Sequence, residues 1–90
     1  MRSTISIARA GDAAFVVTVD DGTTRTVHDV TVTPQDVARY APGMAAGRLV
    51  RASFQFLLER EPKEAILQRF ELPTIERYFP EYPSKIRELL

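Results

Sequence analysis

The sequence predicts an α+β fold: a three-stranded antiparallel β-meander followed by four or five short helices around one longer central helix. Apolar residues alternate at every second position early in the chain and recur at helical spacing later. All aspartates precede residue 37 and all glutamates follow residue 58; aspartate favours turns, whereas glutamate suits helix interiors. Four prolines after residue 60 divide the last third of the chain into short pieces.

The chain has 90 residues, and we expect a single domain over 1–90, with the β-meander in 1–33 and the helical part in 34–90. A domain of this length buries only about 60 to 65% of the surface that its unfolded chain exposes, which leaves no room for a second core. The 12 basic and 12 acidic side chains balance, so net charge provides no general attraction to phosphate groups.

The chain contains no cysteine, which excludes disulfides, thiolate metal sites and a cysteine nucleophile. Apolar runs such as 15–17 and 56–58 are far shorter than the roughly 18 residues that a membrane span needs. The start of the chain lacks the sustained apolar region of a secretion signal. We therefore expect a cytoplasmic protein with no membrane partner.

The expected strands are marked by apolar residues at every second position, as in Phe15, Val17 and Val19. Glycine and aspartate at 11–12 and 21–22 mark two hairpin turns, because these residues tolerate the positive φ of a tight reversal. The resulting sheet would have free edges, and exposed edges readily pair with a partner.

The third strand, expected at 24–33, changes parity, because Val27 is at an odd position and Val30 at an even one. One extra residue between them would restore the inward direction of the apolar side chains. We therefore predict a β-bulge at His28 and Asp29.

The helical part begins after Thr33, which can cap a helix that has Pro34 in its first turn. The longest helical pattern spans 45–60. A helix with only a thin polar stripe must be covered on most sides, so we expect this one between the sheet and the later helices. The polar stripe consists of Arg48, Arg51, Gln55 and Glu59.

Prolines divide the rest of the chain into three expected helices, over 62–70, 73–79 and 84–90. Before them, we interpret Glu59-Arg60-Glu61 as a solvated boundary between two helices. The residues expected to face inward are Ile66 and Phe70 in the first helix, Ile75, Tyr78 and Phe79 in the second, and Ile86, Leu89 and Leu90 in the third.

No motif indicates catalysis. A histidine beside a carboxylate can activate a serine, but His28 and Asp29 are neighbours in a strand and should point to opposite faces. Gly43 and Gly47 match neither a phosphate loop nor a dinucleotide fingerprint. We therefore expect a non-enzymatic protein with no cofactor and no metal site.

Residues 77–83 concentrate three of the eight aromatic side chains in seven residues. Tyrosine and arginine are over-represented at binding hot spots, so Arg77, Tyr78 and Tyr82 are candidate binding residues. The two tyrosines fit a core role equally well, and Phe79 fits the core better. The main functional prediction is a protein-interaction or accessory module whose partner is another protein or a second copy of the chain.

The alternative prediction is a nucleic-acid-binding protein that uses the 62–79 helix pair in the manner of a helix-turn-helix. Glutamates interleave with the basic residues along this segment and weaken its attraction to phosphate. The basic residues that would contact phosphates are Lys63, Arg69, Arg77 and Lys85.

Two pieces of the second half, Leu-Glu-Arg-Glu-Pro at 58–62 and Tyr-Phe-Pro-Glu-Tyr at 78–82, resemble short bacterial proteins that carry no assigned function. The resemblance extends through the second half of the chain. It implies a small stand-alone domain, and it implies no activity, cofactor or site residue.

Overall fold

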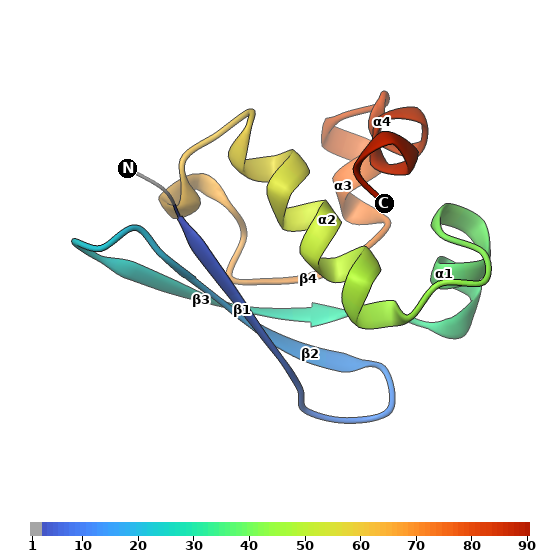
Figure 1. Ribbon diagram of the computed structural model, residues 1–90, viewed down its shortest axis with the longest axis horizontal. Helices are drawn as coiled ribbons and strands as arrows, with labels where there is room; N and C mark the ends of the chain where they lie inside the picture. The colour runs from blue at the N-terminus through green and yellow to red at the C-terminus, as the bar shows by residue number, and fades with distance from the viewer. Residues whose placement is uncertain (1–2) are drawn as a thin grey trace.

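The computed structural model describes residues 3–90 and places four helices on one face of a four-stranded sheet (Figure 1). The predicted α+β class is confirmed, but the sheet has one strand more than predicted. The strands, in their order across the sheet, are β1 (Thr4–Arg9), β2 (Ala14–Asp20), β3 (Arg25–Thr31) and β4 (Arg69–Glu71). The helices are α1 (Pro34–Tyr40), α2 (Ala46–Leu58), the 3-10 helix η1 (Lys63–Ala65), α3 (Thr74–Tyr78) and α4 (Tyr82–Leu89).

The first three strands form the predicted antiparallel meander. In the second hairpin turn, the Asp21 carboxylate accepts the amide hydrogens of Thr23 and Thr24 at 2.9 Å each, and Gly22 adopts a φ of 91°. Only a residue without Cβ adopts this φ readily, so the Asp-Gly pair determines where the chain reverses.

The predicted bulge at His28 and Asp29 is wrong. β2 and β3 pair in one unbroken register from Asp20–Arg25 to Ala14–Thr31. The parity of β3 does not change, because Val27 lies on the outer face, half exposed, and His28 is the buried residue at its level of the strand. The alternating pattern predicted that Val27 faces inward, but the side chain that faces inward at this level of β3 is His28.

The start of the helical part follows the prediction. Thr33 Oγ1 accepts the amide hydrogen of Asp36 at 3.2 Å, and the Asp36 carboxylate accepts that of Thr33 at 2.9 Å, which completes a capping box. After α1, Gly43 turns the chain with a φ of 82°.

Helix α2 lies between the sheet and α4, as expected (Figure 1). Its polar stripe is the exposed side of the helix, and Phe54 and Phe56 are completely buried on its other sides. The ring of Phe54 contacts those of His28 and Phe70, while the ring of Phe56 contacts Phe79 and Tyr82. One helix therefore joins the sheet to the C-terminal segments. None of the helices in residues 3–90 has the length and apolarity that a bilayer crossing requires.

The predicted helix over 62–70 is also wrong. Only the single turn η1 forms, and the chain then runs extended into β4, which pairs parallel to β3 with Phe70 opposite Val30. The amide of Asp29 donates to the carbonyl of Gln68 at 2.7 Å. Backbone pairing with β3 thus overrides the helical spacing of the apolar residues.

The last two helices form close to their predicted positions, with one difference in orientation. Ile75 and Ile86 are buried as expected, but Tyr78 points outward with 67% of its surface exposed. Helix α4 begins at Tyr82, two residues before the predicted start, and Tyr82 is completely buried.

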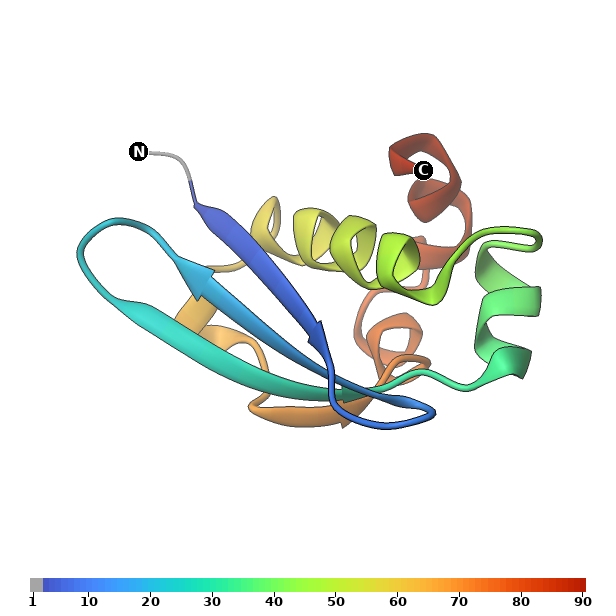
Figure 2. The same cartoon turned by 60° about the horizontal axis from the view of Figure 1, so that its bottom comes forward.

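The outer face of the sheet has no helix over it (Figure 2). Its edges are less free than predicted, because β4 covers the open side of β3. On the other edge, Arg51 of α2 donates from Nη1 to the carbonyl oxygen of Ile5 in β1 at 2.8 Å. The guanidinium group of Arg51 therefore binds one of the backbone carbonyl oxygens that an edge strand leaves unpaired.

Candidate functional site

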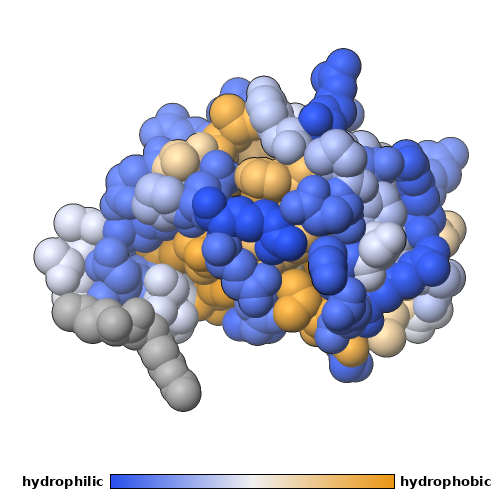
Figure 3. Space-filling model, turned by 90° about the horizontal axis from the view of Figure 1, so that it is seen from above, coloured by the Kyte–Doolittle hydropathy of each residue, from blue (hydrophilic) through white to orange (hydrophobic). Residues whose placement is uncertain are grey.

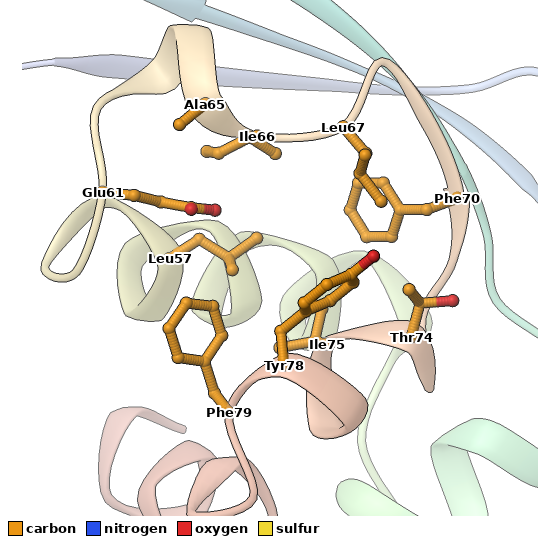
Figure 4. Close-up of a pocket in the computed structure, with 10 residues that line it drawn as sticks. All are labelled: Leu57, Glu61, Ala65, Ile66, Leu67, Phe70, Thr74, Ile75, Tyr78 and Phe79. Atoms are coloured by element: carbon orange, nitrogen blue, oxygen red, sulfur yellow. The ribbon is translucent and has the colours of Figure 1, made fainter.

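Seen from the side of the helices, apolar atoms appear between charged side chains rather than as one continuous patch (Figure 3). The structure also contains a pocket of about 290 Å³ between the end of α2, η1, β4 and α3 (Figure 4). Most of its lining is apolar. The lining residues are Leu57, Glu61, Ala65, Ile66, Leu67, Phe70, Thr74, Ile75, Tyr78 and Phe79.

The pocket gathers apolar surface that the fold leaves open to water. Three large hydrophobic residues of the described chain are exposed, and two of them, Leu67 and Tyr78, line this pocket at 46% and 67% exposure. The floor is formed by buried core residues, Ile66 and Ile75. A concave apolar surface with an exposed aromatic side chain at its edge is typical of a binding site.

Glu61 is the one charged residue of the lining, and its carboxyl group points toward the apolar interior (Figure 4). No ion pair or hydrogen bond to this carboxyl group forms within residues 3–90. Partial burial raises its pKa, because the charged form loses hydration and gains no compensating contact.

The two basic residues nearest to Glu61 in the sequence, Arg60 and Lys63, are paired with other groups. The guanidinium group of Arg60 lies over the ring of Phe56, 3.7 Å from its centroid, and donates to the carbonyl of Phe56 at 3.1 Å. It also pairs with Glu59 at 3.3 Å and with Glu81 at 3.2 Å. Arg60 is thereby directed away from the pocket and does not pair with Glu61.

Lys63 is the second engaged cation. Its side chain is 4% exposed, and its ammonium group donates to Asp21 at 2.6 Å, Thr24 at 2.7 Å and Glu64 at 2.5 Å. These three acceptors use all the hydrogens of the group. Hydrogen bonding to Lys63 lowers the pKa of Asp21 and of Glu64, and the two carboxylates raise the pKa of Lys63.

His28 positions one wall of the pocket. Its Nδ1 lies 2.8 Å from the carbonyl oxygen of Leu67, and because a carbonyl can only accept, Nδ1 carries the hydrogen. Nε2 lies 2.8 Å from Thr26 Oγ1. A buried histidine of β3 thus holds the backbone of the loop from which Leu67 projects.

The predicted binding residues do not come together in one place. Tyr78 lines the pocket, whereas Tyr82 is completely buried and hydrogen-bonds to Ser53. Arg77 is exposed beside a different shallow hollow, together with Arg39. In this fold a partner has access to Tyr78 and Arg77 but not to Tyr82.

The helix pair expected over 62–79 does not form, because the 3-10 helix η1 and the strand β4 take the place of its first helix. Lys63 is buried in its ion cluster and presents no charge to a partner. The Arg69 side chain is 86% exposed and lies 3.8 Å from Asp29, and Lys85 pairs with Glu88 at 3.5 Å. Lys63 and Arg69 line one hollow together with Arg25. Arg77 and Lys85 lie on α3 and α4, so the four predicted phosphate contacts do not form one basic surface.

His28 and Asp29 point to opposite faces of β3, as expected, with His28 buried and Asp29 exposed. Ser53 is buried in α2, and its hydroxyl donates to the Leu49 carbonyl at 2.7 Å. Across the part of the chain that the structure describes, no three His, Cys, Asp or Glu side chains lie close enough to hold a metal ion.

The sequence predictions missed Glu61, Leu67 and Phe70 as parts of a site. The signal for β4 was available, because Phe70 and Leu72 are apolar on either side of Glu71, which is the spacing of a strand. Comparison with known proteins adds no family to these observations: no family model, curated protein or solved structure matches the chain.

Proposed function

We propose that this protein is a non-enzymatic interaction module that receives an apolar side chain of a partner protein in the pocket between α2, β4 and α3. One observation carries the proposal: Leu67 and Tyr78, two of the three exposed large hydrophobic residues of the described chain, line the same pocket. A hot spot of this kind combines an exposed aromatic residue with a cavity that excludes water.

The size and lining of the pocket support a side chain as the occupant. Small-molecule sites usually measure about 300 to 1,000 Å³, and this pocket, at about 290 Å³, lies at the lower limit. Its polar groups are the carboxyl of Glu61 and the hydroxyls of Thr74 and Tyr78. A carboxyl and two hydroxyls on an apolar wall support recognition more than bond-making chemistry.

Selection from a phage-displayed library of random peptides tests the proposal. We expect peptides with a recurrent large apolar residue to be enriched on the wild-type protein, and the enrichment to be lost on Tyr78→Ala and Leu67→Ser. Val27→Ser is the matched control, because Val27 is the third exposed large hydrophobic residue and lies outside the pocket. Enrichment that survives at Tyr78→Ala and Leu67→Ser, or that Val27→Ser abolishes, would overturn the proposal.

A further inference from the structure

We propose that the partner segment carries a lysine or arginine beside the apolar residue that enters the pocket, and that Glu61 and the adjoining acidic hollow receive this cation. The inference rests on the proposed function and adds the chemistry of the partner.

Glu61 forms no ion pair within residues 3–90. The pocket has one charged lining residue, and within residues 3–90 that carboxyl group has no cation beside it. Arg60 is held over the ring of Phe56 and paired with Glu59 and Glu81, and Lys63 is enclosed by its own acceptors. Neither neighbour can turn to Glu61 without breaking these contacts, so among residues 3–90 no cation neutralises this carboxyl group.

The surface on the other side of Glu61 from the apolar pocket is rich in carboxyl groups. A second hollow of about 360 Å³ begins there, and Glu61 lines both it and the apolar pocket. Among residues 3–90, the charged residues of this hollow are Asp21, Glu61, Lys63 and Glu64. Three carboxyl groups around one ammonium group leave an excess of negative charge directly beside the apolar pocket.

A basic residue of the partner would be complementary in charge to Glu61. A cation on the partner would compensate the carboxylate of Glu61 for the hydration that partial burial removes, while an acidic residue there would meet like charge. Repulsion of the wrong sequence contributes to selectivity as much as attraction of the right one. The apolar pocket and the acidic hollow together therefore specify an apolar residue next to a basic one.

The same random-peptide selection tests this inference with a different pair of variants. On the wild-type protein we expect lysine or arginine to be enriched beside the recurrent apolar residue. On Glu61→Gln the apolar residue should remain and the basic preference should disappear. Glu71→Gln is the matched control, because it removes one exposed negative charge from a residue that lines neither the pocket nor the acidic hollow.

Affinity measurements make the expectation quantitative. Replacing the basic residue of an enriched peptide by norleucine should weaken binding to the wild-type protein roughly five- to tenfold, as expected for a partly buried ion pair, and should leave binding to Glu61→Gln unchanged. The loss should diminish at high ionic strength because salt screens the pair.

The outcomes separate the two proposals. Apolar peptides without a basic preference, or a basic preference that persists on Glu61→Gln, would refute the acidic subsite and leave the interaction module standing. Failure to enrich any apolar peptide on the wild-type protein would overturn both proposals.

Discussion

The Tyr82 hydroxyl lies 2.6 Å from Ser53 Oγ, at the point where α4 crosses α2. Ser53 Oγ also donates to the carbonyl oxygen of Leu49 at 2.7 Å, so its single hydrogen is used and the phenol must be the donor to Ser53. Burial raises the pKa of Tyr82 and keeps this donor protonated. A candidate binding residue is therefore the polar connection between the central and the C-terminal helix.

We predict that Tyr82→Phe lowers the free energy of unfolding by about 1 to 2 kcal/mol, because it removes a buried hydrogen bond and keeps the ring. Urea denaturation at neutral pH measures the loss. The same substitution at Tyr78, which is 67% exposed, is the control and should change the free energy by less than about 0.5 kcal/mol. Equal effects at the two positions would show that the Tyr82 hydroxyl is not bonded in the core.

The ion cluster at Lys63 predicts a specific acid response. Hydrogen bonds from Lys63 and from the amides of Thr24 and Thr23 hold the pKa of Asp21 well below its ordinary value of 3.8. A carboxyl group whose pKa is lower in the folded state stabilises the fold above its unfolded pKa and loses that contribution as the pH falls. The stabilisation by Asp21 is therefore complete above about pH 5 and is lost progressively below about pH 4.

We predict that Lys63→Met lowers the melting temperature at neutral pH by several degrees, because Asp21 and Glu64 lose their shared cation. It should also flatten the decline in melting temperature on the acid side, since the pKa of Asp21 then moves back toward its ordinary value. Lys85→Met is the control, because Lys85 is about half exposed and forms an exposed pair with Glu88. A decline at low pH as steep as that of the wild type would contradict the assignment.

Regular periodicity accounts for the parts of the fold that the sequence predicted correctly. Val17 and Val19 alternate with half-buried neighbours in β2, and Arg48 and Arg51 lie on the exposed stripe of α2. In both elements one local pattern extends over at least seven residues. Patterns of that length outweigh the competing local preferences.

The segment from 62 to 72 could not be predicted because its apolar spacing fits two structures. Ile66 and Phe70 are four apart, as in a helix, while Phe70 and Leu72 are two apart, as in a strand. The structure that forms depends on Asp29 and Thr31, whose backbone groups pair with residues 39 to 41 positions later in the chain. Such pairing is a property of the tertiary structure, and the local sequence does not decide between the two spacings.

The site shows the same dependence on tertiary contacts. Tyr78 lies two residues before Pro80 and Tyr82 directly before Pro83, and the hydrogen bond to Ser53 is made by Tyr82, the buried one of the two. Glu61 belongs to a charged Glu-Arg-Glu sequence that is typical of a solvated helix boundary. It becomes the charged member of an apolar pocket because the chain after it folds back along α2.

Arg51 predicts how the open edge of β1 is protected. Its bond to the Ile5 carbonyl lies on an edge that pairs with no other strand of residues 3–90. We predict that Arg51→Ala costs about 1 kcal/mol or less in stability and increases self-association at high protein concentration, because an edge acceptor becomes available. Sedimentation velocity measures the second effect.

Arg48→Ala is the control for that experiment, since Arg48 lies on the same exposed stripe of α2 and lacks the bond to β1. Equal self-association of the two variants would indicate that the lost positive charge, rather than the uncovered edge, is responsible.

His28 connects the sheet to the pocket, and its two hydrogen bonds can be separated by substitution. His28→Leu fills the position with an apolar side chain but leaves the Leu67 carbonyl without its donor, at a cost of about 2 to 3 kcal/mol. His28→Asn keeps a donor near the position of Nδ1 and should preserve the bond to Leu67 while losing the one to Thr26.

Native-state hydrogen exchange distinguishes the two variants. The amide of Asp29 donates to the Gln68 carbonyl and reports directly whether the loop stays closed on β3. We expect this amide to exchange much faster in His28→Leu than in His28→Asn, and peptide binding at Tyr78 to weaken in the same order, because the backbone of Leu67 is no longer held. If both variants protect Asp29 equally, the parallel pairing of β4 alone holds the pocket wall, and the bond from His28 to Leu67 contributes nothing to it.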